Sequence, residues 1–219
     1  MVFDHRKFVG FKKIMRYLGL KTKLSRKLGV DLGLKTTGSK SHLRLLKRLS
    51  VSPGQHGSQR KKITEYGLQL KEKQKIKFMF SVSEKQLKRY FNLASKKRGN
   101  TAVYLSQFLE KRLDNVVYRL GFAPTRASAR QLVSHRHIKV NDQIVNIPSY
   151  QIKVGDVISF SKESSKEIDY VKKMLESKDY LLPKWLERKG EIGKVVEEPD
   201  ITNIEKQINL RSIIELFSR

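Results

Sequence analysis

The chain of 219 residues carries 47 Lys and Arg against 21 Asp and Glu, a formal net charge of +26. This excess opposes compaction of the isolated chain and predicts a polyanionic partner, with nucleic acid first and an anionic membrane surface second. The sequence has no apolar run long enough to span a bilayer and no signal-peptide core near its start, so we expect no membrane partner. The absence of cysteine excludes disulfides and thiolate metal sites.

The basic charge is concentrated in the N-terminal half. Residues 1–100 hold 27 basic and 5 acidic side chains, whereas residues 101–219 hold 20 and 16. Residues 1–62 are rich in Gly, Ser and Thr and show no lasting apolar periodicity, which is typical of a segment that orders only against a polyanion. We therefore expect an extended basic N-terminal arm over 1–62, of which residues 1–60 are largely disordered in the free protein.

The arm ends near a glycine-rich motif, "PGQHG", from Pro53 to Gly57. Glycine lets a backbone approach a phosphate closely, and Gln55 and His56 could add hydrogen bonds. The alternative is a plain surface loop, which the residues alone favour.

From Ile63 onward the pattern predicts helices. Ser83 opens one through a Ser-x-x-Gln capping box, and Gly99 ends it. A longer helix is predicted from about Leu105 to Gly121, because its apolar residues recur at helical spacing.

The following segment changes from helical to strand periodicity. A third helix is predicted from Thr125, a good N-cap, to about His135. Alternation then predicts a small sheet, with a strand at 138–140, a turn at Asn141-Asp142 and further strands beyond it. The stretch "VKKMLESKDYLLPKWLERK" is predicted to be a helix followed by a loop.

Two neighbouring helical patterns each gather polar residues on one face. They are Arg112, Asn115 and Arg119 on the first helix, and Arg126, Arg130 and Ser134 on the second. Guanidinium groups pair with phosphate oxygens in a planar, bidentate manner, so two converging basic faces suit an RNA or DNA backbone. We therefore expect neither Arg126 nor Arg130 to lie in the core. The alternative is an ordinary solvated face, although only Asp114 supplies acid nearby.

Motifs spread over about 205 residues carry a resemblance to a known family. In order they read "MRYLG", "KLSRKLG", "SPGQHG", "YGLQLKEKQK", "GNTAVYLSQFLEKRLDNVVYRLGFAPTRASARQLVSHRHIKVN", "VNIPSYQIKVGD", "PKWLE" and "IIELFSR". Together they closely resemble the family of small-subunit ribosomal protein four, of bacterial or organellar type. Many members of the family carry zinc-binding cysteines in the N-terminal region. This chain has no cysteine and therefore resembles the cysteine-free, zinc-less form.

The resemblance implies an α+β fold with three parts. The basic arm occupies 1–62. A mostly helical domain is formed from both chain ends, with 63–104 completed by 173–219. An RNA-binding module of helices packed on a small β-sheet is inserted at 105–172. One departure from the family is the Asn141-Asp142 turn, usually Asn-Gly, which we expect to survive because Asp tolerates positive φ better than most residues.

The resemblance also implies a function. The family's proteins are structural constituents of the small ribosomal subunit that bind ribosomal RNA first and nucleate assembly of the subunit body. They lie beside the messenger RNA entry path and contact small-subunit protein five, where the interface influences translational accuracy. For this chain we expect the same partners, a location in the ribosome of the cytoplasm or of an organelle, no metal and no cofactor.

Residues and resemblance together give a set of expected RNA contacts. They are Arg16, Tyr17, Lys21, Lys23, Arg26, Arg44, Lys47, Arg48, Gly54, Gln55, His56, Gly57, Arg60, Tyr66, Lys71, Lys73, Gln74, Lys75, Arg112, Asn115, Tyr118, Arg119, Thr125, Arg126, Arg130, Gln131, Ser134, His135, Lys139 and Asn141. Two alternatives stay open within it. The lysines of "KEKQKIK" could form a solvated helix face, Tyr66 and Tyr118 could be core residues, and Trp185, outside the set, is expected to pack.

Two other functional classes were compared with RNA binding. RNA-modifying enzymes carry the same module, but they need a separate catalytic domain, and this chain shows no nucleophile–base pattern and no nucleotide-binding glycine motif. A factor that binds ribosomes only transiently would not need the motifs outside the module.

His135 and His137 lack further ligands for a metal site. We therefore expect a protein without catalytic activity.

Overall fold

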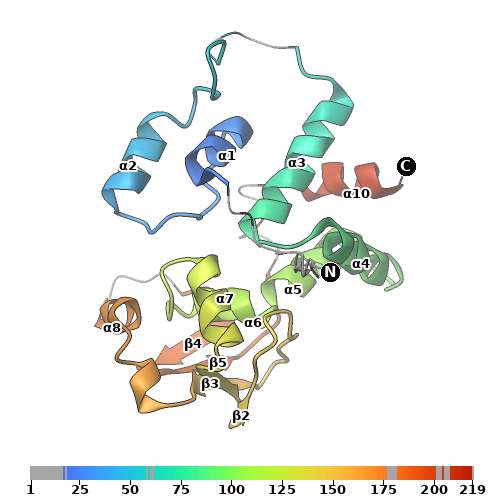
Figure 1. The fold of residues 1–219 in the computed structure, drawn as a ribbon. Coiled ribbons are helices and arrows are strands. Elements are labelled where there is room, and N and C mark those ends of the chain that lie inside the picture. The colour runs from blue at the N-terminus through green and yellow to red at the C-terminus, as the bar shows by residue number, and fades with distance from the viewer. Residues whose placement is uncertain are drawn as a thin grey trace, which may run out of the picture.

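The computed structural model describes residues 17, 19–57, 59, 62–176, 182–200, 204 and 208–218. Figure 1 shows two halves: helices α1–α5 and α10 form one, and a sheet with α6–α8 forms the other. The α+β prediction is confirmed. Over these ranges, no helix combines the length and apolar character that a membrane span requires.

The helical half combines the N-terminal arm, the following helices and the C-terminus. Its elements are α1 (Lys21–Leu28), α2 (Lys40–Lys47), α3 (Glu65–Met79), α4 (Glu84–Ser95), α5 (Thr101–Glu110) and α10 (Leu210–Ser218). Leu24, Leu28 and Leu32 of the arm join the same core as Ile213 of α10. The described residues of the arm therefore form more helix than its sequence pattern predicts, whereas its disorder in the free protein stays a prediction.

The sheet half has a continuous core of its own. Its elements are α6 (Leu113–Arg119), α7 (Arg126–Ser134), β1 (Ile138–Val140), β2 (Gln143–Ile144), β3 (Val157–Phe160), the 3₁₀ helix η1 (Glu163–Ser165), α8 (Asp169–Glu176), β4 (Leu186–Lys189) and β5 (Ile192–Val195). The five strands are antiparallel in the order β2-β1-β3-β5-β4. Inward residues such as Val140 and Ile158 pack against α6 and α7 in one cluster.

The turn between β1 and β2 forms as predicted. Asn141 and Asp142 have φ values of 48° and 65°, the left-handed pair that a tight hairpin needs. Asn141 stabilises the turn by donating to Asp156 at 2.8 Å and accepting from the backbone N–H of Val157 at 2.9 Å.

The predicted single helix from Leu105 to Gly121 is wrong, because the chain breaks at Arg112. That residue has extended φ and ψ and precedes α6 as its N-cap. Two β-type contacts explain the break: Ile152 donates to the Lys111 carbonyl at 2.9 Å, and Leu113 donates to the Tyr150 carbonyl at 2.9 Å. A distant loop thus takes the backbone bonds that a continuous helix would use.

The loop expected from Pro183 to Leu186 is present up to Trp185, where it leads into an unpredicted hairpin, β4–β5. It pairs with β3 through the Val157–Lys194 and Ile158–Gly193 registers. A Cβ on Gly193 would lie 2.4 Å from a methyl carbon of Leu120, so glycine lets this strand pack directly on the end of α6. Residues 186–195 therefore belong to the sheet half, which corrects their assignment to the helical domain. Trp185, 3% exposed, packs in the sheet core as expected.

Candidate RNA interface

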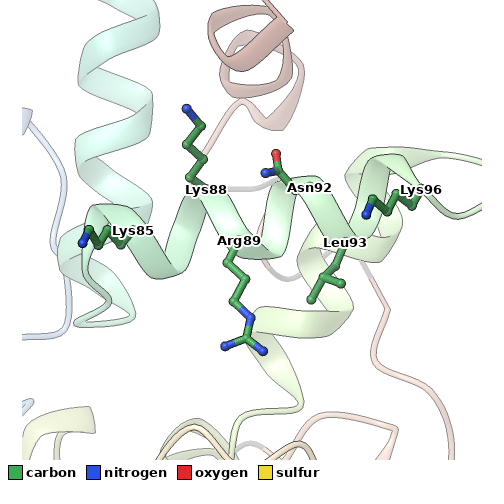
Figure 2. A pocket seen from close by; sticks show the side chains of 6 residues that line it. All are labelled: Lys85, Lys88, Arg89, Asn92, Leu93 and Lys96. Carbon is green, nitrogen blue, oxygen red and sulfur yellow. The ribbon is translucent and has the colours of Figure 1, made fainter.

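The outward face of α4 carries a strip of cations that the sequence analysis missed. Lys85, Lys88, Arg89 and Lys96, here called the α4 basic strip, are all exposed. With Asn92 and Leu93 they line one shallow hollow (Figure 2). Their spacings of three, four, seven and eleven residues place them on one side of a helix, opposite the buried residues of α4. At 1.5 Å per residue the strip is about 16 Å long.

No acidic side chain lines this hollow. The nearest in sequence, Glu84, instead bonds Lys73 at 2.7 Å and Lys77 at 3.3 Å on α3. The hydrogen bond from Lys73 is the largest cause of the lowered pKa of Glu84, which therefore stays ionised. The strip cations have no hydrogen-bond or ion-pair partner among the described residues, so their charge is available to a polyanion. A cationic stripe without acid, opposite a known apolar stripe, could have been recognised in the sequence.

The arm presents a second basic surface on α1 and α2. The predicted contacts Lys21, Lys23, Arg44, Lys47 and Arg48 are all exposed. Arg26 joins α1 to the loop after α2, because its guanidinium donates to the carbonyls of Val51 and Ser52 at 2.9 and 3.2 Å. Arg26 therefore holds the loop as well as adding charge. Arg16 and Arg60 lie outside the described residues.

The "PGQHG" loop has a conformational reason for its glycines. Gly54 has a φ of 110°, which L side chains rarely adopt. A Cβ on Gly57 would lie 1.9 Å from the Ser52 carbonyl oxygen, so only glycine fits. Gln55 and His56 are exposed at the tip of this loop and are free to meet a partner.

The predicted contacts on α3 are only partly available. Lys73 is paired with Glu84, and Lys75 bonds Glu72 at 2.6 Å, as expected for a salt-bridged helix face. Lys71 and Gln74 are half-buried.

The predicted aromatic contacts differ in their exposure. Tyr66, at the start of α3, is 54% exposed and is therefore not a core residue. Tyr17 is 42% exposed and packs edge-on against Phe78. Tyr118 is half-buried in the sheet half, against the main cluster.

Arg112, expected on a basic face, is instead 2% exposed. It donates to both carboxylate oxygens of Asp114, at 3.0 and 2.7 Å, and to the hydroxyl of Tyr90 on α4 at 3.0 Å. Burial by itself lowers the pKa of Arg112, but Asp114 and Tyr90 outweigh it and raise it. The helix break explains the error, since Arg112 as N-cap does not continue the face of α6.

A second buried group of polar residues, here called the Glu110 network, consists of Glu110, Asn115, Arg119 and Arg126. Arg119 binds the Glu110 carboxylate in bidentate fashion at 2.6 and 3.1 Å, and Asn115 donates to it at 2.6 Å. Nε of Arg126 donates to the side-chain amide oxygen of Asn115 at 2.8 Å. Glu110, Asn115 and Arg126 are 1%, 1% and 8% exposed.

The cations of the network keep its acid ionised. Burial by itself raises the pKa of Glu110, but the charge and hydrogen bond of Arg119, the charge of Arg126 and the hydrogen bond of Asn115 together lower it. The two arginine-bearing helices do converge, as predicted, but they converge on an internal carboxylate. The expectation that Arg126 lies outside the core is wrong, because it faces Glu110, which the linear spacing did not include.

The remaining predicted residues of the sheet half differ in their exposure. Thr125 is buried as the N-cap of α7 and accepts from the Ser128 N–H, as the capping prediction requires, so it is not a surface residue. Arg130 is half-buried and donates to the Ser81 carbonyl at 3.0 Å. The exposed members are Gln131, Ser134, His135 and Asn141, with Lys139 half-buried. They leave a small polar surface on α7 and β1.

The described residues contain no cluster of three or more His, Cys, Asp or Glu that could hold a metal ion. His135 and His137 lie with ring centroids 6.2 Å apart, and His137 bonds the Ser165 hydroxyl at 2.9 Å. Burial, followed by the charges of His135 and Lys162, lowers the pKa of His137.

Comparison with known proteins gives the family. Residues 16–110 match the Ribosomal protein S4/S9 N-terminal domain, and residues 111–158 match the S4 domain. The chain is 49% identical over 213 residues to small ribosomal subunit protein uS4 of Aquifex aeolicus (strain VF5), covering 93% of this chain and 99% of the relative. It is 47% identical over 209 residues to uS4 of Sulfurihydrogenibium sp. (strain YO3AOP1), with 93% and 98% covered. It is 45% identical over 207 residues to uS4 of Delftia acidovorans (strain DSM 14801 / SPH-1), with 93% and 99% covered.

These relatives are named as ribosomal proteins and not as enzymes, which confirms the prediction that the chain is not an enzyme. The two domain matches follow one another along the chain, and the relatives are matched over nearly their whole length. The chain therefore belongs to the uS4 family of small ribosomal subunit proteins.

Proposed function

We propose that this chain is a structural constituent of the small ribosomal subunit and binds small-subunit ribosomal RNA through its helical half. The observation that carries the proposal is the α4 basic strip, a set of exposed cations with no acid among them. Ordinary solvated helix faces mix both signs, as α3 does with its Lys75–Glu72 pair. A single-sign strip is instead typical of a surface that follows a phosphate backbone.

The arm supports the same role. Its exposed cations on α1 and α2 extend the positive surface, and the sequence of residues 1–100 carries a net charge of +22. The polar surface of α7 and β1, with Gln131, Ser134 and His135, is a smaller contact of the sheet half. RNA would then meet both halves.

The finer role follows from the family resemblance. We propose that the protein binds ribosomal RNA early, nucleates assembly of the subunit body, lies near the messenger RNA entry path and influences translational accuracy through small-subunit protein five. Its place would be in the ribosome.

Three measurements test the proposal. Native protein should sediment with small ribosomal subunits and remain bound in moderate salt; release there would support a transient factor. Purified protein should bind small-subunit ribosomal RNA with an affinity that falls steeply with salt, each neutralised phosphate adding about 0.7–0.9 to the slope of log affinity against log salt. A nearly flat slope would show that the basic surfaces do not face RNA. Mass spectrometry of the recovered RNA should show no new modification.

A further inference from the structure

The junction between the two halves holds a guanidinium in an unusual position. Arg126 of α7 lies with its guanidinium carbon 4.9 Å from the ring centre of Phe80, in the helical half, and 4.5 Å from that of Tyr118, in the sheet half. The loop after α1 also reaches this point, since a Cβ on Gly33 would lie 3.5 Å from Nη1 of Arg126. Three separate segments of the chain therefore meet at one side chain.

Hydrogen bonds inside the sheet half fix the orientation of the Arg126 guanidinium. Its Nε donates to Asn115, and Asn115 donates to both the carboxylate and the backbone carbonyl of Glu110. Glu110 is the last residue of α5 and of the N-terminal domain match, whereas its three partners lie in the S4 domain match. The network thus joins the two matched domains at their boundary. A buried, fully bonded polar group of this kind specifies one geometry, because any other leaves charges unpaired.

Two further contacts cross the same junction. Arg130 donates to the carbonyl of Ser81, whose φ of 51° is rare for a residue with a side chain. Arg112 donates to Tyr90 of α4, the helix that carries the basic strip on its other side. Arg112 and Arg130 therefore join the sheet half to α4 and to the segment just before it.

We propose that Arg126 is a positioning residue, which holds the helical half and the sheet half in one fixed orientation so that RNA meets both of their surfaces as a single rigid body. The inference rests on the proposed RNA-binding function. Arg126 then acts indirectly, because its guanidinium does not contact phosphate. Without Arg126 the two halves would be free to change their relative orientation, and RNA binding would have to fix that orientation. Linked surfaces bind more tightly when their spacing is already correct.

The absence of cysteine allows a direct measurement on the full chain. Ser95 at the end of α4 and Ser164 in η1 are exposed, so Ser95→Cys with Ser164→Cys gives one spin label in each half. We expect a single narrow distance distribution without RNA. Arg126→Met and Arg126→Lys should both broaden it, because lysine keeps the charge but lacks the planar fork that bonds Asn115 and stacks on the rings. RNA should narrow it again.

Binding measurements separate positioning from direct contact. Arg126→Lys should weaken RNA affinity at least tenfold while leaving the salt slope unchanged, since the same phosphates are neutralised in the complex. The matched control, Arg89→Met on the α4 strip, should lower the slope by about 0.7–0.9 and leave the label distances unchanged.

Two outcomes would overturn the proposal. One is an unchanged distance distribution in Arg126→Lys. The other is an Arg126→Met protein that keeps a narrow label-distance distribution but whose salt slope for RNA binding falls by the amount of one phosphate contact. That result would make Arg126 a direct RNA ligand. If Arg126→Met fails to fold, the Arg126→Lys protein decides alone. Failure of the proposed function is seen separately, as absence of RNA binding by the unsubstituted protein.

Discussion

The α4 basic strip and the Glu110 network use the same kind of side chain in opposite surroundings. On α4, four cations at helical spacing are exposed and lack internal partners among the described residues. In the sheet half, Arg112 and Arg119 instead bond the buried acids Asp114 and Glu110. The difference shows that spacing locates a polar face, whereas the position of the nearest buried acid decides whether that face meets solvent.

The comparison also separates two contributions to RNA binding. Exposed cations add affinity through the phosphates that they neutralise, and they add little to stability. Buried cations hold the protein in shape, and removing one leaves its partner charge without compensation. Substitutions in the two regions should therefore change different measurements.

The largest expected effect comes from the buried pair. Arg112→Ala leaves Asp114 buried without its cation, so the free energy of unfolding should fall by about 3–5 kcal/mol. Urea unfolding followed by circular dichroism measures this. Arg89→Ala on the exposed strip is the matched control and should change stability by less than about 0.5 kcal/mol. Equal effects of the two substitutions would remove the distinction between the regions.

Substitution of the whole α4 strip should act on binding and spare the fold. With Lys85, Lys88, Arg89 and Lys96 all changed to Gln, the salt slope for ribosomal RNA should decrease by about 3, since each lost phosphate contact removes about 0.7–0.9. Filter binding at several salt concentrations provides the slope. The same four changes should leave the unfolding transition close to that of the unsubstituted protein. An unaltered slope would show that this strip faces away from RNA.

The Glu110 network predicts a pH dependence of stability. Because the pKa of Glu110 is lowered in the folded protein, its contribution is present above the pKa of the unfolded chain and is lost as pH falls through the folded value. The stability difference between the unsubstituted protein and Glu110→Gln should stay constant from about pH 7 to about pH 5 and shrink below that. Urea titrations across this range measure it. A difference that grows toward low pH would contradict the assigned sign.

The smallest effect is expected at the surface pair between α3 and α4. The side chain of Glu84 is 53% exposed, so Glu84→Gln should cost at most about 1 kcal/mol of stability. The same change releases Lys73 and Lys77 beside the strip, and RNA affinity at low salt should rise slightly. Thermal unfolding and binding at low salt test the two parts, and a loss of affinity would show that the pair itself contacts RNA.

Local patterns were sufficient for much of the fold. Ser83 and Thr125 cap their helices as predicted, because a side-chain oxygen satisfies an N–H within three residues and needs nothing distant. The turn at Asn141-Asp142 formed because both residues adopt positive φ, and bonds to Asp156 and Val157 stabilise it further. The surplus of cations in residues 1–100, the exposed arm cations and the lack of a catalytic pattern were also readable directly, as was the family.

Other features depend on residues that are distant in sequence, and only the tertiary structure shows them. The helix break at Arg112 depends on backbone bonds from residues about forty positions away, and the β4–β5 hairpin depends on Gly193 meeting Leu120. The burial of Arg126 depends on Glu110, Asn115 and Phe80 arriving at one point. Sequence determined which residues are polar and how they are spaced along each element. Only long-range packing decided which of those polar residues would face an internal partner, because the cost of burying a charge is set by what surrounds it.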